Sequence, residues 1–257
     1  MEHFVWSGDP IAFSLGGVRV FWYGILFATA ILSGLEIMKW IYKQENKNLA
    51  QLDSIFLYVV IGIVIGARLG HCLFYEPKYY LSHPLEILYI SNGGLASHGG
   101  GLGALLGIYF YKKKHSLNFL WFLDRIALPT AVFAFFVRLG NFANSEILGK
   151  ATDVSWAVVF TKVDKLPRHP AQLYEAFSYL LIALILFVIY TKFRDRFKEG
   201  FFFGLFLTLV FIVRFLVEFV KERQAEYTAD TLLSAGQFLS IPFIIIGILL
   251  IYKSMRK

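Results

Sequence analysis

The sequence has few charged residues and a single cysteine. Charged side chains make up 17% of the 257 residues, against roughly 25% in an ordinary soluble domain, whereas hydrophobic residues make up 57%. A soluble protein of this size could not bury that much apolar surface in one core. Because Cys72 is the only cysteine, an internal disulfide framework is excluded. The composition also excludes a disordered chain and favours a helical membrane protein with several spans.

Several catalytic motifs are absent as well. The sequence has no His-Glu-x-x-His zinc motif, no Gly-x-Ser-x-Gly nucleophile elbow and no Walker loop, so it predicts no metal and no cofactor. The net charge of +7 has another explanation than nucleic-acid binding, because membrane proteins carry excess lysine and arginine in their cytoplasmic loops. We therefore expect a lipid bilayer, and no nucleic acid, as the partner of this chain.

Seven apolar stretches are long enough to span a membrane, which takes roughly 20 residues each. They cover residues 21–41, 52–75, 94–111, 118–137, 172–191, 200–220 and 233–252. Basic residues cluster after the first, third, fifth and seventh stretches, as at 112–114 and 192–198. Because these connections alternate, the positive-inside rule places the N-terminus outside and the C-terminus in the cytoplasm. The predicted fold is an all-α polytopic membrane protein, a single integral domain over residues 1–257.

Two predicted outer segments have strand character. Gly16 and Gly17 separate 12–15 from 18–20, as in a two-residue β-hairpin. Residues 153–160 are rich in β-formers and predict a strand. They lie in the connection 138–171, which we expect to form a small extracytoplasmic cap.

Polar residues gather at one end of six of the seven stretches. Ionisable groups inside a membrane are costly and are functional candidates by default. The group comprises Tyr23, Arg68, His98, Arg138, Asn141, His169, Gln172, Tyr174, Glu175, Arg214 and Glu218. This convergence predicts one site near the outer leaflet.

The residue types in this group indicate an anionic lipid headgroup as the ligand. Arginine presents forked donors that match phosphate oxygens, and His98 is a natural proton acceptor near neutral pH. Glu146, Glu175 and Glu218 can orient the arginines or partly neutralise them, and Arg214 has the spacing to pair with Glu218 four residues on. A transporter for an anionic lipid would also need such arginines, but its polar groups should line a path through both leaflets of the membrane. A non-catalytic scaffold would need no base, and an intramembrane protease would need a nucleophile or metal motif.

The glycines around His98 are also consistent with close packing of helices, without a functional role.

Seven short motifs follow one another along the chain. The principal one is Arg138–Glu146 (RLGNFANSE), with Gly149 beyond it. The supporting stretches are Phe21–Gly24, Gly66–Gly70, Ser97–Gly100, His169–Glu175, Arg214–Phe219 and Gly236–Pro242. Together they cover nearly the whole chain, and in this order they resemble the motifs of the prolipoprotein diacylglyceryl transferase family of bacteria. The seven-helix, N-out topology of that family agrees with the one predicted from the loop charges.

The resemblance implies an activity. Such enzymes move the diacylglyceryl group of phosphatidylglycerol onto the lipobox cysteine thiol in a prolipoprotein signal peptide, forming a thioether and releasing glycerol phosphate. This is the first step of lipoprotein maturation, and it takes place at the bacterial cytoplasmic (inner) membrane, in the outer leaflet. The resemblance implies that His98, Arg138 and Arg214 are catalytic. It also implies that the substrate-binding residues are Tyr23, Arg68, Asn141, Glu146, Gly149 and Glu218.

The chain departs from the family pattern at a few positions. Val137 and Ser145 stand where the family commonly has glycine, and Gly101 replaces a common apolar residue. A functional tyrosine of the family is replaced by Val210, four residues before Arg214. That change puts a universal catalytic role of the tyrosine in doubt.

Overall fold

The computed structural model describes residues 3–89, 94, 96–115, 117–222 and 233–255. It divides the chain into two compact units. The first unit comprises Met1–Met38 and Leu123–Lys257, and the second comprises Lys39–Phe122.

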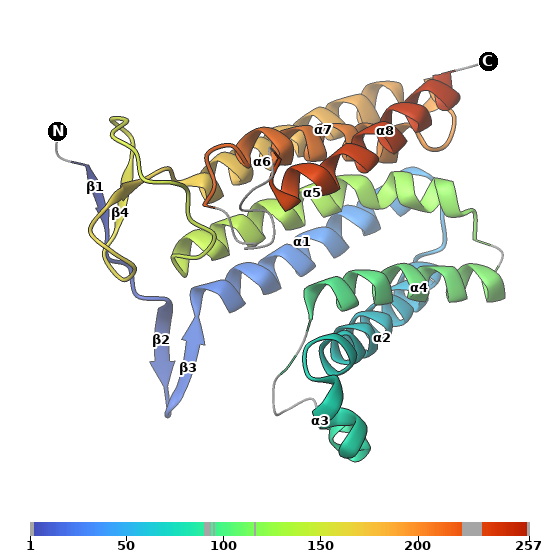
Figure 1. Cartoon of the computed structure of the whole chain (residues 1–257). Helices are drawn as coiled ribbons and strands as arrows, with labels where there is room; N and C mark the ends of the chain where they lie inside the picture. Colours follow the sequence, from blue (N-terminus) through green and yellow to red (C-terminus); the bar gives the residue numbers. More distant parts are fainter. Residues whose placement is uncertain (1–2, 90–93, 95, 116, 223–232, 256–257) are drawn as a thin grey trace. The chain divides into compact units, whose positions relative to one another are not determined.

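Five helices build most of the first unit (Figure 1). They are α1 (Trp22–Gln44), α5 (Phe119–Ala143), α6 (Ala171–Phe193), α7 (Phe201–Val217) and α8 (Ala235–Met255), with the short turn η3 (Arg194–Arg196) after α6. Of these, α1 and α5 extend a few residues into the second unit. The helices α7 and α8 approach closely because Gly204 and Gly247 face each other. A Cβ on either glycine would lie within 2.8 Å of the other's carbonyl oxygen. Small residues at such a crossing let the two backbones pack directly.

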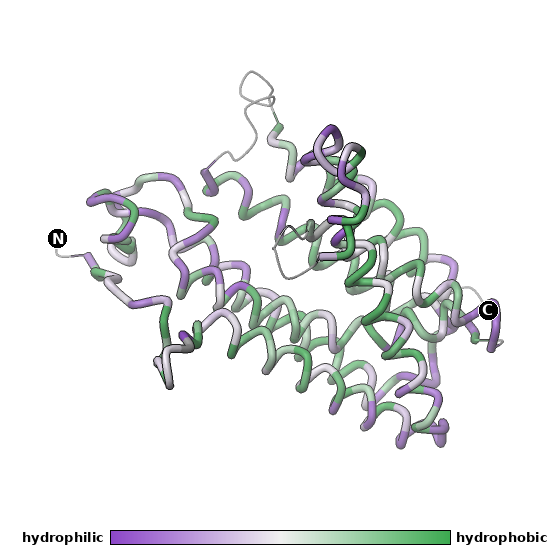
Figure 2. Tube along the Cα trace, turned by 90° about the horizontal axis from the view of Figure 1, so that it is seen from below, coloured by the Kyte–Doolittle hydropathy of each residue, from purple (hydrophilic) through white to green (hydrophobic). Residues whose placement is uncertain are grey.

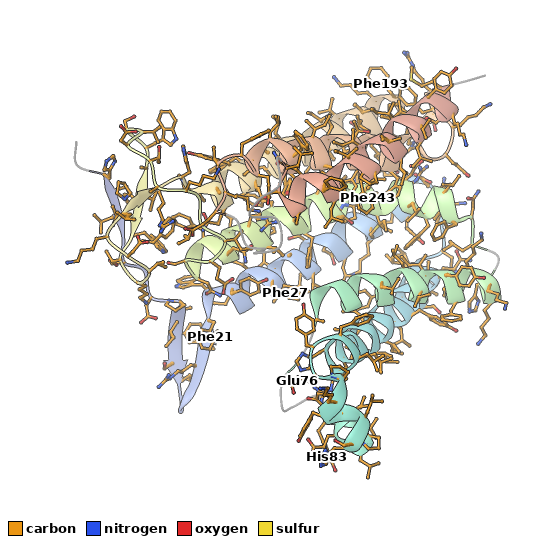
Figure 3. All side chains as sticks on the ribbon, viewed as in Figure 1. Phe21, Phe27, Glu76, His83, Phe193 and Phe243 are labelled. Atoms are coloured by element: carbon orange, nitrogen blue, oxygen red, sulfur yellow. The ribbon has the colours of Figure 1, made fainter. Side chains whose placement is uncertain are left out.

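Aromatic ring pairs connect several of these helices. Phe211 of α7 stacks on Phe243 of α8 with ring centroids 4.4 Å apart, and Phe243 is labelled in Figure 3. Phe27 of α1 meets Phe133 of α5 edge to face at 5.2 Å. Such pairs add stabilisation beyond the area they bury, so α1 is tied to α5 and α7 to α8.

A buried carboxylate joins α5 to the start of α7. Asp124 accepts hydrogen bonds from the backbone N–H groups of Gly200 at 2.8 Å and Phe203 at 2.9 Å. The first N–H groups of a helix have no partner within the helix, and Asp124 supplies one from a neighbouring element. This explains why an acidic residue occurs inside the fourth predicted span.

The strands lie in two small sheets of the first unit. Strand β4 (Val158–Phe160) pairs in parallel with β1 (Phe4–Trp6) and antiparallel with β5 (Pro167–Arg168). The strand expected over 153–160 is therefore shorter than predicted. Its side chains pack into a core of Leu148, Val158 and Phe160 with Trp6 and Phe142.

The predicted hairpin is confirmed. Strands β2 (Ile11–Leu15) and β3 (Val18–Phe21) pair antiparallel. Gly16 and Gly17 have φ angles of +55° and +84°, which is the left-handed region that a two-residue hairpin turn requires.

The second unit is built on the pair α2 (Leu49–Phe74) and α4 (Ser97–His115). Glycines bring their backbones into contact: a Cβ on Gly66 would lie 2.3 Å from the carbonyl oxygen of Gly99, and one on Gly103 would lie 1.9 Å from that of Gly62. The short helices α3 (Pro77–Ser82) and η1 (Pro84–Leu88) follow α2, with Glu76 and His83 flanking α3 (Figure 3). The sequence did not predict these two short helices.

Each of the seven predicted spans is a helix in the described part of the chain. Five of them, α1, α2, α5, α6 and α8, are long and apolar enough to cross a membrane. The helix α7 is apolar but has 17 residues, and α4 ends in three lysines and a histidine. Figure 2 shows the middles of the long helices as mostly hydrophobic and the connections as more polar. The chain is therefore a helical, multi-pass membrane protein.

Candidate functional site

An ion pair between α5 and α6 forms the centre of the candidate site. The Nε atom of Arg138 lies 3.0 Å from Oε2 of Glu175, and the Glu175 side chain is fully buried. Arg138 stands near the end of α5, and Glu175 stands in the first turns of α6. A buried carboxylate is costly unless it is paired, so this contact fixes both side chains together.

A chain of hydrogen bonds continues from Arg138 into the turn after α5. A terminal nitrogen of Arg138 donates to Oδ1 of Asn141 at 3.2 Å, and Nδ2 of Asn141 donates to Oε2 of Glu146 at 3.1 Å. Asn144 donates to the other carboxylate oxygen of Glu146 at 3.0 Å. Asn141 therefore bridges the guanidinium and the carboxylate, each through a different end of its amide.

The turn itself needs unusual backbone geometry. Ser145 and Ile147 both have a φ of +57°, in the region that residues with a Cβ adopt at a cost. Glycine is free of that cost, so the glycine that the resemblance leads one to expect at position 145 would suit this turn better than Ser145 does. Gln172 of α6 holds the turn by donating to the backbone carbonyl of Glu146.

Lys221, which the sequence analysis did not single out, lies on the other side of Glu175. Its ammonium group is 3.4 Å from Oε1 of Glu175 and 3.7 Å from Oε2 of Glu218. Burial lowers the pKa of Lys221, with the neighbouring Arg138 and Arg214 acting in the same direction and the two carboxylates opposing them. The only feature of the sequence that could have identified Lys221 as a site residue is its position three residues after Glu218.

Gly149 lies where three segments meet. Its N–H donates to the carbonyl of His169 at 3.1 Å, and its backbone pairs with that of Lys221. A Cβ at Gly149 would lie 2.4 Å from the His169 carbonyl oxygen. Only glycine allows this approach without a backbone shift, so its place in the family's motif has a structural cause here.

Glu218 and Tyr23 each lie against a glycine. The carboxylate of Glu218 is packed on Gly236 of α8, where a Cβ would approach it to 2.6 Å. The Tyr23 ring is packed on Gly140 of α5, where a Cβ would approach it to 2.7 Å, and its hydroxyl is within electrostatic range of Glu146 and Arg138.

Arg214 is a half-buried residue of α7. It lies within electrostatic range of Tyr179 and Lys221. Its spacing predicted a pair with Glu218, but in the described part of the structure the ion pair of Glu218 is with Lys221. Arg214 thus adds positive charge to the same region of the first unit.

The other two predicted residues belong to the second unit. Arg68 of α2 is buried, and it donates to the backbone carbonyls of Glu86 at 2.6 Å, Ile87 at 2.8 Å and Gly94 at 3.3 Å. Its guanidinium also lies over the ring of Tyr80. These contacts secure the segment between α2 and α4, and a role for Arg68 in binding substrate stays a prediction.

His98 stands in the first turn of α4. Its side chain lies outside the described part of the structure, so its role as a base also stays a prediction. The first unit brings together seven of the nine predicted residues: Tyr23, Arg138, Asn141, Glu146, Gly149, Arg214 and Glu218.

The arrangement has the chemistry of an anion site. Arg138, Arg214 and Lys221 supply positive charge, and the carboxylates of Glu175 and Glu218 pair with two of them, Arg138 and Lys221. Across the described residues, no group of three or more histidine, cysteine or acidic side chains is placed to hold a metal ion. A phosphate group is the ligand that such guanidinium donors fit best.

Comparison with known proteins identifies relatives over the whole chain. The family model described as prolipoprotein diacylglyceryl transferase matches residues 10–253. A phosphatidylglycerol–prolipoprotein diacylglyceryl transferase of Tolumonas auensis is 53% identical, with 98% of each chain covered. The protein of the same name from Chloroherpeton thalassium is 50% identical over 100% of this chain and 96% of its own. One from Bacteroides fragilis is 43% identical over 98% and 95%.

Proposed function

The chain belongs to the prolipoprotein diacylglyceryl transferase family, and from this premise we propose how its residues carry out the reaction. It is a transferase that moves the diacylglyceryl group of phosphatidylglycerol to prolipoproteins, the first step of lipoprotein maturation. The acceptor is the thiol of the lipobox cysteine in the signal peptide, and the products are a thioether and glycerol phosphate.

The phosphate of phosphatidylglycerol binds between Arg138 and Arg214. The observation that carries this assignment is the pairing of Arg138 with a fully buried Glu175. Together with Asn141, which accepts from a terminal nitrogen, this contact orients the guanidinium before the lipid arrives. A preorganised donor stabilises developing negative charge without a reorganisation cost during the reaction. Tyr23, Glu146, Gly149 and Glu218 shape the same site around the headgroup.

The reaction is a displacement at the glyceryl carbon. His98 takes the proton of the cysteine thiol, whose ordinary pKa is about 8.5, so that little thiolate forms unaided near neutral pH. The thiolate sulfur then forms a bond to the carbon as the carbon–oxygen bond to phosphate breaks. The electron pair of that bond goes to the phosphate oxygen, and Arg138 and Arg214 stabilise the charge that it gathers.

The protein lies in the bacterial cytoplasmic membrane with seven spans, its N-terminus outside and the site at the outer leaflet. The alternate basic connections support this orientation, with 138–171 forming the extracytoplasmic cap. A single cysteine introduced between Lys112 and His115, in a Cys72→Ala background, should react with an impermeant reagent only after permeabilisation. Labelling in intact cells would refute the orientation.

Lysine variants of the two arginines test the headgroup assignment. Arg138→Lys and Arg214→Lys keep the charge but lose the planar fork, and we expect each to lose at least about tenfold in turnover, as for loss of a strong transition-state contact. The control is Arg196→Lys, an exchange in η3, which should leave turnover within about twofold. Wild-type turnover in both site variants would show that the forked contacts are unnecessary.

His98→Gln tests the proposed base. Glutamine can hydrogen-bond but cannot accept a proton at useful pH, so turnover should fall by about 10²–10⁴. Phosphatidylglycerol should still bind, since both arginines remain. If lipid binding falls in step with turnover, His98 contacts the headgroup and the base lies elsewhere.

A further inference from the structure

Lys221 is a buried lysine whose backbone is fixed from both sides. It follows α7 and pairs with Gly149 in an isolated antiparallel bridge. On either side of it, the N–H of Lys150 donates to the carbonyl of Val220 at 2.8 Å, and the N–H of Glu222 donates to that of Leu148 at 3.1 Å. Its side chain is 6% exposed. A lysine is almost never buried to this extent unless it is paired, so its surroundings need an explanation.

The ammonium group of Lys221 stands between two carboxylates. It lies 3.4 Å from Oε1 of Glu175 and 3.7 Å from Oε2 of Glu218. The other oxygen of Glu175 lies 3.0 Å from Nε of Arg138. Charges therefore alternate along a line from Arg138 through Glu175 and Lys221 to Glu218, and Glu175 divides its two oxygens between two cations.

This division matters for the headgroup arginine. A fully buried carboxylate with a single cationic partner would largely neutralise the charge of that partner, because the attraction between charges is large where water is excluded. A phosphate would then compete with Glu175 for Arg138. A second cation on the same carboxylate weakens that competition while leaving the Nε contact in place.

We propose that Lys221 is a positioning residue for Arg138: it shares the charge of Glu175, so that Glu175 orients Arg138 without neutralising it. The proposal rests on the proposed binding of phosphate by Arg138. Lys221 itself acts through Glu175 and need not touch the lipid.

The charge state of Lys221 provides a readout that packing alone would not move. The charged and titratable groups that face it are Glu175, Glu218, Arg138 and Arg214. In addition, the hydroxyl of Tyr179 donates a hydrogen bond to Oε1 of Glu175 at 3.5 Å. Since burial lowers the pKa of Lys221, it loses its proton at a lower pH than an ordinary lysine. Activity that needs the ammonium should therefore fall on the alkaline side, and arginine at this position should remove that fall because it stays charged.

The test compares Lys221→Met and Lys221→Arg with wild type, using phosphatidylglycerol in detergent micelles and a lipobox peptide as substrates. We expect Lys221→Met to lose at least about tenfold in kcat/KM for the lipid, since a misplacement of about 1 Å can cost about a hundredfold in rate. Lys221→Arg should keep kcat/KM within about threefold at pH 7 and should hold its activity to higher pH than wild type. The matched control is Lys150→Met, because Lys150 lies in the same paired segment and its ammonium contacts the carbonyl of Phe219 instead.

The outcomes separate this inference from the proposed function. Normal kcat/KM in Lys221→Met, or an alkaline fall in Lys221→Arg as early as in wild type, would overturn the positioning role and leave the transferase activity standing. Failure of the wild-type protein to modify the peptide would instead refute the proposed function. If Lys221→Met does not fold, as judged by its thermal midpoint, the pH profile of Lys221→Arg decides.

Discussion

Replacing Glu175 by glutamine should destabilise the protein measurably, although the two side chains have nearly the same shape. The change removes the negative charge that lies 3.0 Å from Arg138 and 3.4 Å from Lys221. Both cations would then be left in a site where their side chains are only 14% and 6% exposed. Removing one partner of a buried ion pair typically costs about 3–5 kcal/mol.

The lower end of that range applies here. Arg138 keeps its hydrogen bond to Asn141, and Lys221 can release its proton because burial already lowers its pKa. A loss of about 3 kcal/mol corresponds to a fall of roughly 6–12 °C in the thermal midpoint of a chain of this length. The deficit should shrink as the pH rises, since Lys221 then becomes neutral and the repulsion between the two cations disappears.

Thermal unfolding in detergent, followed between pH 7 and pH 10, would measure this. Glu222→Gln is the matched control, because its carboxylate pairs with Arg168 but its side chain is 58% exposed, and surface pairs contribute little. A Glu175→Gln protein that melts with wild type, or a deficit that stays constant as the pH rises, would refute the reasoning about the charges around Glu175.

Three further predictions concern other parts of the site and its cap. Gly236→Ala should lower turnover with little loss of stability, because the new Cβ displaces only the flexible end of Glu218; turnover and thermal midpoint, measured together, would show whether the two effects separate. Hydrogen bonding from Arg168 lowers the pKa of the Asp164 carboxyl, so the stability from this pair is complete above about pH 4, the ordinary value for aspartate, and is lost as the pH falls through the lowered value. The midpoint difference between wild type and Asp164→Asn should therefore vanish in acid, and a difference that persists there would contradict the assignment. Arg138→Ala should be less active than Arg138→Lys, because it loses the charge as well as the fork; equal turnover in the two variants would show that charge without the fork contributes nothing.

The long helices of this protein were predictable from the sequence because each of them coincides with a long run of apolar residues. All seven predicted stretches are helices, and the hairpin around Gly16 and Gly17 is confirmed. The pairing of β1 with β4 was not predictable, because it joins residues about 150 positions apart. Neither segment has a sequence pattern that indicates which strand it pairs with. The short helix α3 was missed for a different reason, since six residues carry too little periodicity.

The candidate site was partly predictable. Polar residues within apolar stretches stand out, which is how Arg138 and Arg214 were found, and glutamate was expected to orient them. Lys221 was missed because it lies in a polar connection, where a lysine is ordinary. Its burial depends on a backbone pairing with Gly149 that could not be predicted from the sequence. Gly149 itself was identified by resemblance, and the close approach of the His169 carbonyl supplies the physical reason.

The central claim is that this protein transfers a diacylglyceryl group with Arg138 at the phosphate. The most direct test is the mass of a lipobox peptide after incubation with purified protein and phosphatidylglycerol, for wild type and Arg138→Lys side by side. We predict that wild type adds the mass of one diacylglyceryl group to the cysteine, with release of glycerol phosphate, and that the variant does so at least about tenfold more slowly. An unchanged peptide mass with wild type, across several lipids and detergents, would contradict the account.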